Sequence, residues 1–481
     1  MNVLLIYSLQ DAQSTEKPLS TPQQIQFGIS YISSFLKEKG HNTELLILTR
    51  ETKNSVIDEY LERFKPELIG FTAVATEFDF VENIARYIKS RCPHIYLLIG
   101  GVHVSLNPED SMLEYFDALC VGEGEEPALE LINQLEEGKT PAGIANLWIK
   151  HNKEIEKTPT RPFINNIDNL PFPDRKMWIK WTETSGLCCS VLLGRGCPFQ
   201  CTYCCNHAVR TVSEGAYVRF RSPENVINEL EEISLMFPEM DEVYYEIETF
   251  VARIKWAIDI CSALESFNSK RERPFTYGVN LRITPNSQYE TLFEGMKKSN
   301  FKYVNIGLES GSERVRKDIL KRNYSNDDII NAVTLARKYG LKVSFFNLIG
   351  IPGETVDDFK ETVRVNRICL PDRHYLSIFY PYPGTELYFL CKKQGLIDDN
   401  INPELERRKS VLDLNGFSRK QIQRSYIWFD YYAFKGYRPL YKILAKVFLS
   451  QIHSNYYLNR LYNKITCIKG FNLLKRFLRS Y

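Results

Sequence analysis

The sequence predicts an α/β protein. A doubly wound, Rossmann-like domain is expected at residues 1–150, a partial (β/α)6 barrel of the TIM type at 186–395, and a helical C-terminal extension at 396–481. Apolar runs of strand length alternate with amphipathic segments in the first two regions, a pattern typical of parallel sheets. At 151–185 the alternation stops in a polar stretch punctuated by prolines, which we interpret as an ordered linker. A chain of 481 residues is also long enough for two to four domains.

The first region begins with a short apolar run that reads as a buried parallel strand, followed by an amphipathic segment that Gly40 ends. The same pair of patterns then repeats. The expected strands are 3–7, 43–48, 68–74, 96–100 and 118–121, and the expected helices are 27–39, 56–64, 78–91 and 126–135. A doubly wound sheet binds its ligands beyond the carboxyl ends of its strands.

The second region repeats the alternation six times. The expected strands are 190–193, 242–247, 276–280, 303–307, 342–348 and 375–379. Six strands with intervening helices indicate an incomplete barrel, whose active site lies at the carboxyl ends of the strands. The final region is helical in pattern and belongs to neither repeat.

The composition is that of an ordinary globular protein, with 44% apolar and 25% charged residues and a net charge of +2. No basic segment precedes the first apolar run, and no stretch of about 18 apolar residues occurs, so we expect neither a signal peptide nor a spanning helix. Twelve cysteines without an export signal indicate a reducing, cytoplasmic environment rather than a disulfide framework.

Six of the twelve cysteines lie between residues 188 and 205. The segment GRGCPFQCTYC at 194–204 follows the first barrel strand and places three cysteines at x3 and x2 spacing. Three thiolates in one loop can hold a cubane iron–sulfur cluster and leave one iron open to chelate a substrate. The alternatives are buried thiols or a structural zinc site, to which His207 or Cys205 could add a fourth ligand.

At this motif the chain resembles the radical S-adenosylmethionine superfamily, whose signature is Cys-x3-Cys-x2-Cys with an aromatic residue before the last cysteine. The resemblance covers residues 186–395. It implies that Cys197, Cys201 and Cys204 hold a [4Fe–4S] cluster, which Tyr203 shields. It further implies that one electron from the cluster cleaves S-adenosylmethionine to a 5′-deoxyadenosyl radical.

The resemblance also implies contacts to S-adenosylmethionine at the ends of later strands. Glu246 and Glu248 end the second strand, where the family places acidic residues near the amino group, although the cobalamin-linked branch usually has Asp-Asp-x-Phe there. Arg282 is expected to pair with the carboxylate. Glu309 is expected to accept the ribose hydroxyls, and Ser310 to contact the carboxylate. For each residue alone, a surface ion pair or a helix cap is the alternative.

The N-terminal domain resembles the cobalamin-binding domain of cobalamin-dependent radical S-adenosylmethionine proteins. The matching segments are GFTAV at 70–74, GGVH at 100–103 and VGEGE at 121–125. The resemblance places Thr72, Gly100 and Gly101 at the corrinoid. The Asp-x-His-x-x-Gly loop that supplies a lower cobalt ligand in many cobalamin domains is absent. His103 is either a ligand or a hydrogen-bonding residue in a turn.

The last 51 residues, 431–481, contain ten Lys or Arg and no Asp or Glu, interleaved with aromatic and aliphatic residues. Basic amphipathic helices can lie in an anionic membrane interface, so peripheral contact with the inner face of the membrane is one hypothesis. A helix packed on the barrel with its basic face in water is the other. Nothing else in the sequence indicates nucleic acid as a partner.

The resemblance implies an enzyme that uses the cluster, S-adenosylmethionine and cobalamin, with a flavodoxin or ferredoxin as electron donor. The first hypothesis is methylation of an unactivated centre in a small-molecule or lipid-linked substrate. The second hypothesis is an oxidative cyclase or rearrangement enzyme that uses the same cofactors without transferring a methyl group. A non-catalytic iron–sulfur or zinc protein is the third. The identity of the substrate is not readable from the sequence.

Overall fold

The computed structural model describes residues 1–9, 15–19, 24–152, 154–182, 188–285, 288–398, 401–455, 457–459 and 461–462. The chain divides into two compact units. The first unit is Met1–Pro198 with Cys205–Met240, and the second is Phe199–Cys204 with Asp241–Tyr481. The sequence around the three cysteines therefore passes from the first unit to the second and back.

In the described residues of the first unit, a seven-stranded sheet has the order β2-β1-β3-β4-β5-β6-β7. Its strands are β1 (Asn2–Leu9), β2 (Asn42–Thr49), β3 (Leu68–Thr72), β4 (Tyr96–Gly100), β5 (Ala118–Cys120), β6 (Leu147–His151) and β7 (Glu154–Lys157). Strands β1 to β5 pair in parallel. After β2 is added on one side of β1, the chain adds β3, β4 and β5 on the other side. This reversal between β1 and β3 confirms the doubly wound sheet, which binds its ligands beyond the carboxyl ends of the strands at this point.

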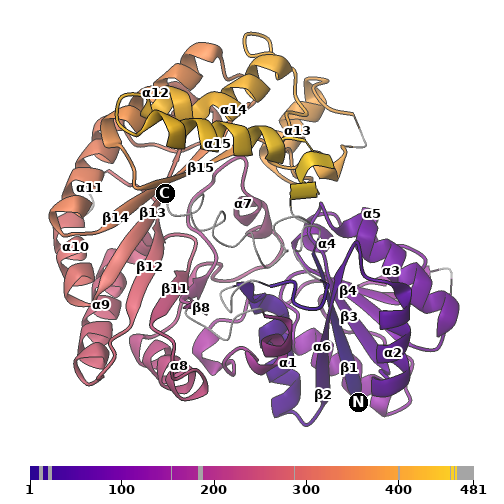
Figure 1. The fold of residues 1–481 in the computed structure, drawn as a ribbon. Coiled ribbons are helices and arrows are strands. Elements are labelled where there is room, and N and C mark those ends of the chain that lie inside the picture. The colour runs from indigo at the N-terminus through magenta and orange to yellow at the C-terminus, as the bar shows by residue number, and fades with distance from the viewer. Residues whose placement is uncertain are drawn as a thin grey trace. The chain divides into compact units, whose positions relative to one another are not determined.

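Helices cover both faces of this sheet (Figure 1). They are α1 (Phe27–Glu38), α2 (Asn54–Phe64), α3 (Phe78–Arg91), α4 (Val102–Leu106), α5 (Pro108–Ser111) and α6 (Glu125–Glu136). Strand β1 contributes four consecutive side chains that are at most 4% exposed, Val3, Leu4, Leu5 and Ile6. An apolar run buried on both faces is what a central parallel strand requires.

Strands β6 and β7 are a finding that the alternation did not predict. They form an antiparallel hairpin on the edge of the first sheet. The sequence of β7 is EIEK, whose side chains are exposed or half-buried, so it lacks the apolar run that marks a buried strand. Farther along, the short 3-10 helices η2 (Ile167–Asn169) and η3 (Lys176–Trp181) follow, and Trp178 enters the core of the first unit and donates to Ser30 Oγ at 2.8 Å.

The second sheet has the order β15-β14-β13-β12-β11-β8 in the part of the chain that is described. Its strands are β8 (Cys188–Leu192), β11 (Glu242–Glu246), β12 (Thr276–Leu281), β13 (Phe301–Glu309), β14 (Lys342–Ile349) and β15 (Arg373–Ile378). Strands β11 to β15 pair in parallel. These are the six strands expected from the sequence, and the partial barrel is confirmed.

The remaining elements lie between and after these strands. They are β9 (Gly194–Arg195), α7 (Cys205–Val209), β10 (Arg219–Phe220), α8 (Pro223–Met236), η4 (Phe250–Arg253), α9 (Ile254–Ser269), α10 (Tyr289–Lys298), the π-helical η5 (Val315–Ile319), α11 (Asn326–Lys338), α12 (Val356–Cys369), α13 (Glu386–Lys393), η6 (Pro403–Leu405), α14 (Arg419–Phe434) and α15 (Leu440–His453). The helical C-terminal region is thereby confirmed.

Helix α14 is part of the core of the second unit. Phe429 is 1% exposed, and its ring lies 6.3 Å from that of Phe359 on α12. The buried pair of His374 on β15 and Asp430 on α14 joins the helix to the sheet with an Nε2–Oδ2 distance of 3.1 Å. The C-terminal region is therefore integral to this unit up to at least α14.

Candidate functional site

The cysteine loop is fixed in the second unit by a guanidinium group. Arg282, which follows β12, donates from NH1 to Cys201 Sγ at 2.7 Å. Its guanidinium carbon lies 3.7 Å from the ring centre of Phe199. Arg282 and Cys201 are 8% and 7% exposed, so this contact is shielded from water. The residue expected to bind a carboxylate thus lies beside one of the three cysteines.

A second buried arginine, Arg322, joins three parts of the same region. It donates to Tyr203 Oη at 2.9 Å and to the Gly307 carbonyl at 2.8 Å, and it lies 3.2 Å from Glu309 Oε1. Burial is the main reason that the pKa of Tyr203 is raised well above its usual value, so the phenol remains protonated. Arg322 was missed in the sequence, where a Lys-Arg pair in a loop has no periodicity that marks it as buried.

Glu309 sits at the end of β13 in a strained backbone conformation, with a φ of +59°. Few residues other than glycine adopt this region, and such strain is commonly found at functional sites. A Cβ on Gly307 would lie 2.5 Å from Glu309 Oε1, so glycine is required there for the carboxylate to hold its position.

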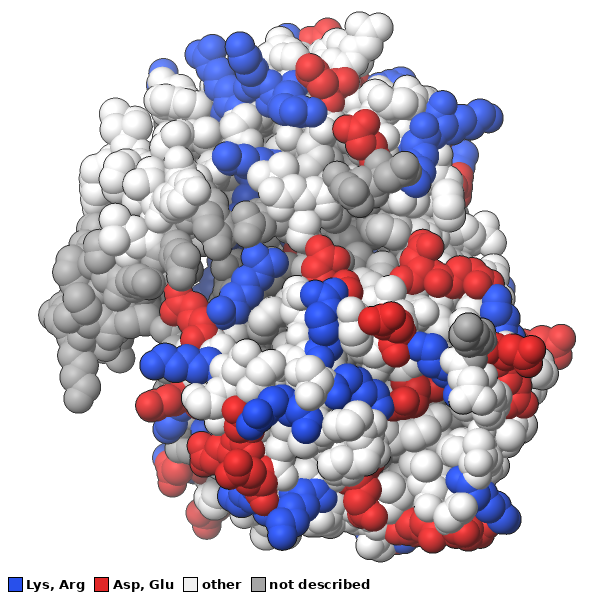
Figure 2. All heavy atoms as spheres, turned by 90° about the vertical axis from the view of Figure 1, so that its right-hand side faces the viewer, with Lys and Arg blue, Asp and Glu red and all other residues white. Residues whose placement is uncertain are grey.

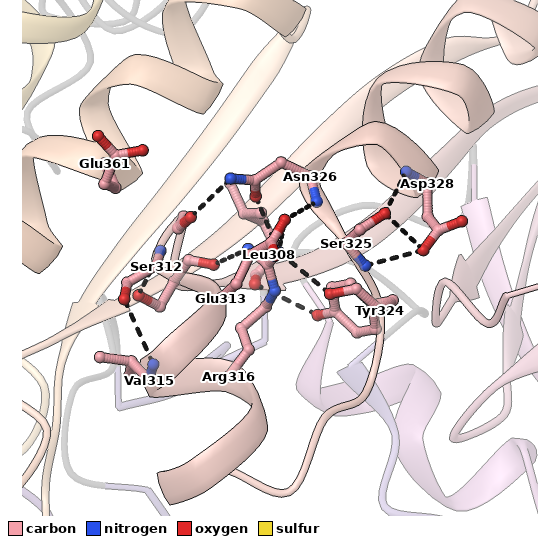
Figure 3. A network of polar contacts seen from close by, with 12 residues as sticks. Leu308, Ser312, Glu313, Val315, Arg316, Tyr324, Ser325, Asn326, Asp328 and Glu361 are labelled. Carbon is pink, nitrogen blue, oxygen red and sulfur yellow. Dashed lines mark hydrogen bonds and ion pairs between the residues drawn. The ribbon is translucent and has the colours of Figure 1, made fainter.

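Ser310 is fully buried. Figure 3 shows the polar network that follows β13, with Ser312, Arg316 and Asn326 among the residues drawn. Arg316 on η5, also fully buried, donates to the Ser310 carbonyl at 2.5 Å and to Asn326 Oδ1 at 2.8 Å. The Ser310 hydroxyl lies 3.4 Å from Thr362 Oγ1 and accepts from the Ser312 amide at 3.2 Å. This network holds the turn after β13, and the contact of Ser310 with a ligand stays a prediction.

Glu246 ends β11 on the face of the second sheet opposite to Tyr245, which is fully buried. Burial, followed by repulsion from Glu248, raises the pKa of Glu246 to about 7. The Glu246 carboxyl is therefore partly protonated near neutral pH and can donate as well as accept a hydrogen bond. Glu248 is exposed.

The same face carries a polar cluster and an aromatic pair. Tyr244 Oη donates to Asn280 Oδ1 at 2.5 Å, and Asn305 donates to Tyr244 Oη at 3.1 Å. Phe346 and Tyr375, on neighbouring strands, stack with ring centres 5.1 Å apart and are 36% and 48% exposed. Exposed stacked rings beside hydrogen-bonding groups are suited to binding an organic molecule.

The first unit contains a cavity of about 350 Å³ between the sheet and helices α1 and α6. Thr72, Gly100 and Gly101 line it at the ends of β3 and β4, and Gly122 and Gly124 line it after β5. The contact of the first three with a corrinoid stays a prediction. Gly101 has a φ of +104°, and a Cβ there would lie 2.6 Å from the Ala73 carbonyl oxygen. The strand ends therefore approach one another too closely for any larger residue at this position.

His103 lies on the short helix α4, and its role as a cobalt ligand stays a prediction. Its ring stacks on Phe78 with centres 4.6 Å apart, and burial lowers its pKa. The Nδ1 atom is buried without a hydrogen-bond partner among the described residues. His103 is not among the residues that line the cavity.

Comparison with protein families finds two known domains, one after the other along the chain. Residues 22–132 match the B12 binding domain, and residues 191–365 match the radical SAM superfamily. The chain is a cobalamin-dependent radical SAM enzyme. The matched domains support the cofactors that the sequence predicts, since the radical SAM domain implies a [4Fe–4S] cluster and S-adenosylmethionine, and the B12 binding domain implies cobalamin.

Relatives of this radical SAM enzyme cover most of its length. An uncharacterized methyltransferase of Pyrococcus horikoshii is 29% identical over 440 residues, which are 88% of this chain and 90% of the relative. The anaerobic magnesium-protoporphyrin IX monomethyl ester cyclase of Rubrivivax gelatinosus is 22% identical and covers 88% and 78% of the two chains. Among solved structures, the radical SAM methyltransferase TsrM of Kitasatospora setae has a TM-score of 0.66 at 18% identity and covers 82% and 76%.

The residues present fit the cofactors of the radical SAM family in their chemistry. Three thiol side chains in one loop are the donor set that a cluster with one open iron requires. Among the described residues, which include these three cysteines, no group of three His, Cys, Asp or Glu side chains lies close enough to hold a metal ion, so the convergence of the three thiols on a cluster stays a prediction. The glycine-lined cavity suits a bulky ligand that threads between sheet and helices.

Proposed function

We propose that this enzyme transfers a methyl group to an unactivated carbon or phosphorus centre of a small-molecule or lipid-linked substrate. The observation that carries the proposal is the match of nearly the whole chain to a methyltransferase, with 88% of this chain and 90% of the relative covered. When bound, the cluster with S-adenosylmethionine supplies a carbon-centred radical, and the corrinoid supplies a methyl group.

The side chains of the second unit have distinct roles in this proposal. Arg282 positions the cysteine loop and pairs with the methionyl carboxylate. The carboxylate of Glu309, which Arg322 holds in place, accepts hydrogen bonds from the ribose hydroxyls. Glu246 and Glu248 bind the methionyl amino group. The Phe346–Tyr375 pair and the Tyr244–Asn280–Asn305 cluster bind the substrate and exclude water from the reacting centre.

Oxidative cyclisation or rearrangement without methyl transfer is the second candidate. The observation in its favour is the cyclase of Rubrivivax gelatinosus, which matches 88% of this chain. The two candidates use the same cofactors and differ in whether the methyl group of S-adenosylmethionine leaves the cofactor.

An experiment without substrate distinguishes the two candidates. The anaerobic protein, loaded with cluster and hydroxocobalamin, is reduced and mixed with S-adenosylmethionine that carries a deuterated methyl group. We expect S-adenosylhomocysteine to form once per chain, with the label retained by the corrinoid in mass spectra. Protein without corrinoid is the control and should give no S-adenosylhomocysteine. Formation of 5′-deoxyadenosine alone by the loaded protein would favour the cyclase.

The C-terminal region carries the proposal of peripheral membrane contact. Of the large apolar side chains that are exposed in the described residues, eight lie on α15 or close to it in the sequence; these are Tyr437, Leu440, Tyr441, Leu444, Phe448, Tyr457, Leu458 and Leu461. Leu440, Leu444 and Phe448 recur at helical spacing and so share one face. Residues 463–481, which hold half of the basic residues, lie outside the described residues.

Other partners follow from the same proposal. No described helix is long and apolar enough to cross a membrane. Lys and Arg are interspersed with Asp and Glu over the face drawn in Figure 2, a mixture that does not single out nucleic acid as a partner.

We further propose that a flavodoxin or ferredoxin is the electron donor. We also propose that the enzyme is located in the cytoplasm, in peripheral contact with the inner face of the membrane.

Vesicle binding tests the membrane contact. We expect the protein to sediment with anionic vesicles and to be released by salt, because the attraction of each Lys or Arg, about 1 kcal/mol, is screened. Truncation before α14 would remove core residues, so the test variant is Leu444→Ser with Phe448→Ser. The control is Phe389→Ser, since Phe389 on α13 is 59% exposed. Equal sedimentation of the test and control variants would contradict the membrane contact and would leave α15 as a helix that only packs on the barrel.

A further inference from the structure

The cysteine loop is entered through a short two-stranded ladder in the first unit. Strand β9 pairs with β10 so that Arg195 lies directly opposite Arg219. Like charges at opposite positions destabilise a sheet. Arg195 also stands only two residues before Cys197 in the sequence. Packing alone gives no reason for two arginines at this point of the ladder.

Both guanidinium groups reach the same carboxylate. Glu123, in the loop after β5, lies 2.7 Å from Arg195 NH1 and 2.9 Å from Arg219 NH1. Arg195 NH2 extends to Glu125 at 2.6 Å, and the guanidinium carbon lies 5.1 Å from the ring centre of Tyr31 on α1. The like-charged arginines are thus compensated by carboxylates from one distant segment.

These four side chains are almost removed from water. Arg195 and Glu123 are 16% and 17% exposed as side chains, Arg219 is 5% exposed and Glu125 is 3% exposed. Burial raises the pKa of Glu123, but the two guanidinium groups outweigh it, so the pKa lies below its usual value. Buried ion pairs contribute little net stability compared with apolar packing, and their best-attested use is to fix a geometry.

The ion-pair network also borders the cavity of the cobalamin-binding domain. Glu123, Glu125, Arg195, Arg219 and Tyr31 all line it. The two glutamates belong to the VGEGE segment, 121–125, in which Glu123 lies in the loop after β5 and Glu125 is the first residue of α6. The glycines of this segment line the same cavity. One side chain, Arg195, therefore touches both the wall of the cavity and the backbone that leads into the cluster cysteines.

We propose that Arg195 is a positioning residue that couples corrinoid binding to the cluster loop. A corrinoid bound in the cavity fixes the position of segment 121–125 and with it the carboxylates of Glu123 and Glu125. Through their ion pairs with Arg195, these carboxylates fix the backbone that leads to Cys197. Coupling between two binding sites is reciprocal, so a bound cluster must tighten corrinoid binding by the same factor. The proposal does not depend on which group the enzyme transfers.

The test compares the dissociation constant of hydroxocobalamin, measured from its visible spectrum, for the full chain with and without a reconstituted cluster. In the wild type we expect the cluster to tighten binding about fivefold or more, the lower range of typical coupling. In Arg195→Gln the two dissociation constants should become equal. Arg161→Gln is the matched control, because Arg161 pairs with Glu126 and Glu130 on α6 in the same unit.

A second readout and a second variant guard against a folding defect. Loss of iron to a chelator, followed in the wild type, should slow when hydroxocobalamin is present and should be unaffected by it in Arg195→Gln. Glu125→Gln keeps the Arg195–Glu123 pair and should show an intermediate coupling. Coupling of wild-type strength in both variants, or no coupling in the wild type, would overturn the proposal.

Discussion

Replacing Cys197, Cys201 and Cys204 together by alanine should leave the protein without its cluster. The wild type, reconstituted anaerobically, is expected to carry about four irons per cluster with broad visible absorbance. The triple variant has no thiolate left in the loop, so its iron content, absorbance and 5′-deoxyadenosine formation should all fall to background. Iron and sulfide analysis, visible spectra and chromatography of the nucleoside measure these three quantities.

Two cysteines outside the motif provide the control for this experiment. Cys188 on β8 and Cys205 on α7 are half-buried and flank the motif in sequence. Their replacement by alanine should keep the full iron content, because neither belongs to the x3-x2 spacing. A complete cluster in the triple variant would refute the assignment of the ligands, and its loss in Cys205→Ala would favour a fourth ligand.

Gly101→Ala should strongly weaken corrinoid binding by the first unit. Its Cβ would lie 2.6 Å from the Ala73 carbonyl oxygen and 2.8 Å from the Ala73 nitrogen, both backbone atoms that cannot turn away. Overpacking costs about 1–3 kcal/mol, and the left-handed backbone adds about 1–2 kcal/mol. Because the displaced strand ends line the cavity, we expect about a 10- to 100-fold loss in hydroxocobalamin affinity.

Gly40→Ala is the matched control for this loss. Gly40 has a φ of +89° in the same unit, and nothing lies within 4 Å of the Cβ that alanine would add. This variant therefore carries the backbone strain without the clash, and it should lower the thermal midpoint slightly while leaving corrinoid affinity unchanged. Equal affinities of Gly101→Ala and the wild type would mean that the corrinoid does not use the 350 Å³ cavity.

The parallel strands of the first sheet could be predicted because they are apolar runs, and burial of such runs on both faces is typical of a parallel sheet. Those of the second sheet could be predicted from the regular alternation of strand and helix patterns. The β6–β7 hairpin could not, because EIEK in β7 is polar and lies at an edge. The segment around Trp178 resembles a linker in composition, yet its aromatic side chain fills the core of the first unit.

The cysteine motif was readable because its spacing is local. The residues that position the motif were not, since their partners lie far apart in the sequence. Arg322 meets Tyr203 across 119 residues, and Arg195 meets Glu123 across 72. A buried ion pair of this kind leaves no periodicity in either segment, and only the folded chain shows which arginines are covered.

Because α14 is part of the core, the barrel of the second unit cannot complete its packing until α14 has been synthesised. The pair of His374 and Asp430, with Phe429 beside it, covers β15 only after the ribosome has made residues well beyond that strand. At translation rates of about 5–20 residues per second, the roughly 55 residues between β15 and the end of α14 take roughly 3–11 s. During that interval the nascent barrel exposes apolar surface, to which chaperones that hold unfinished chains would bind.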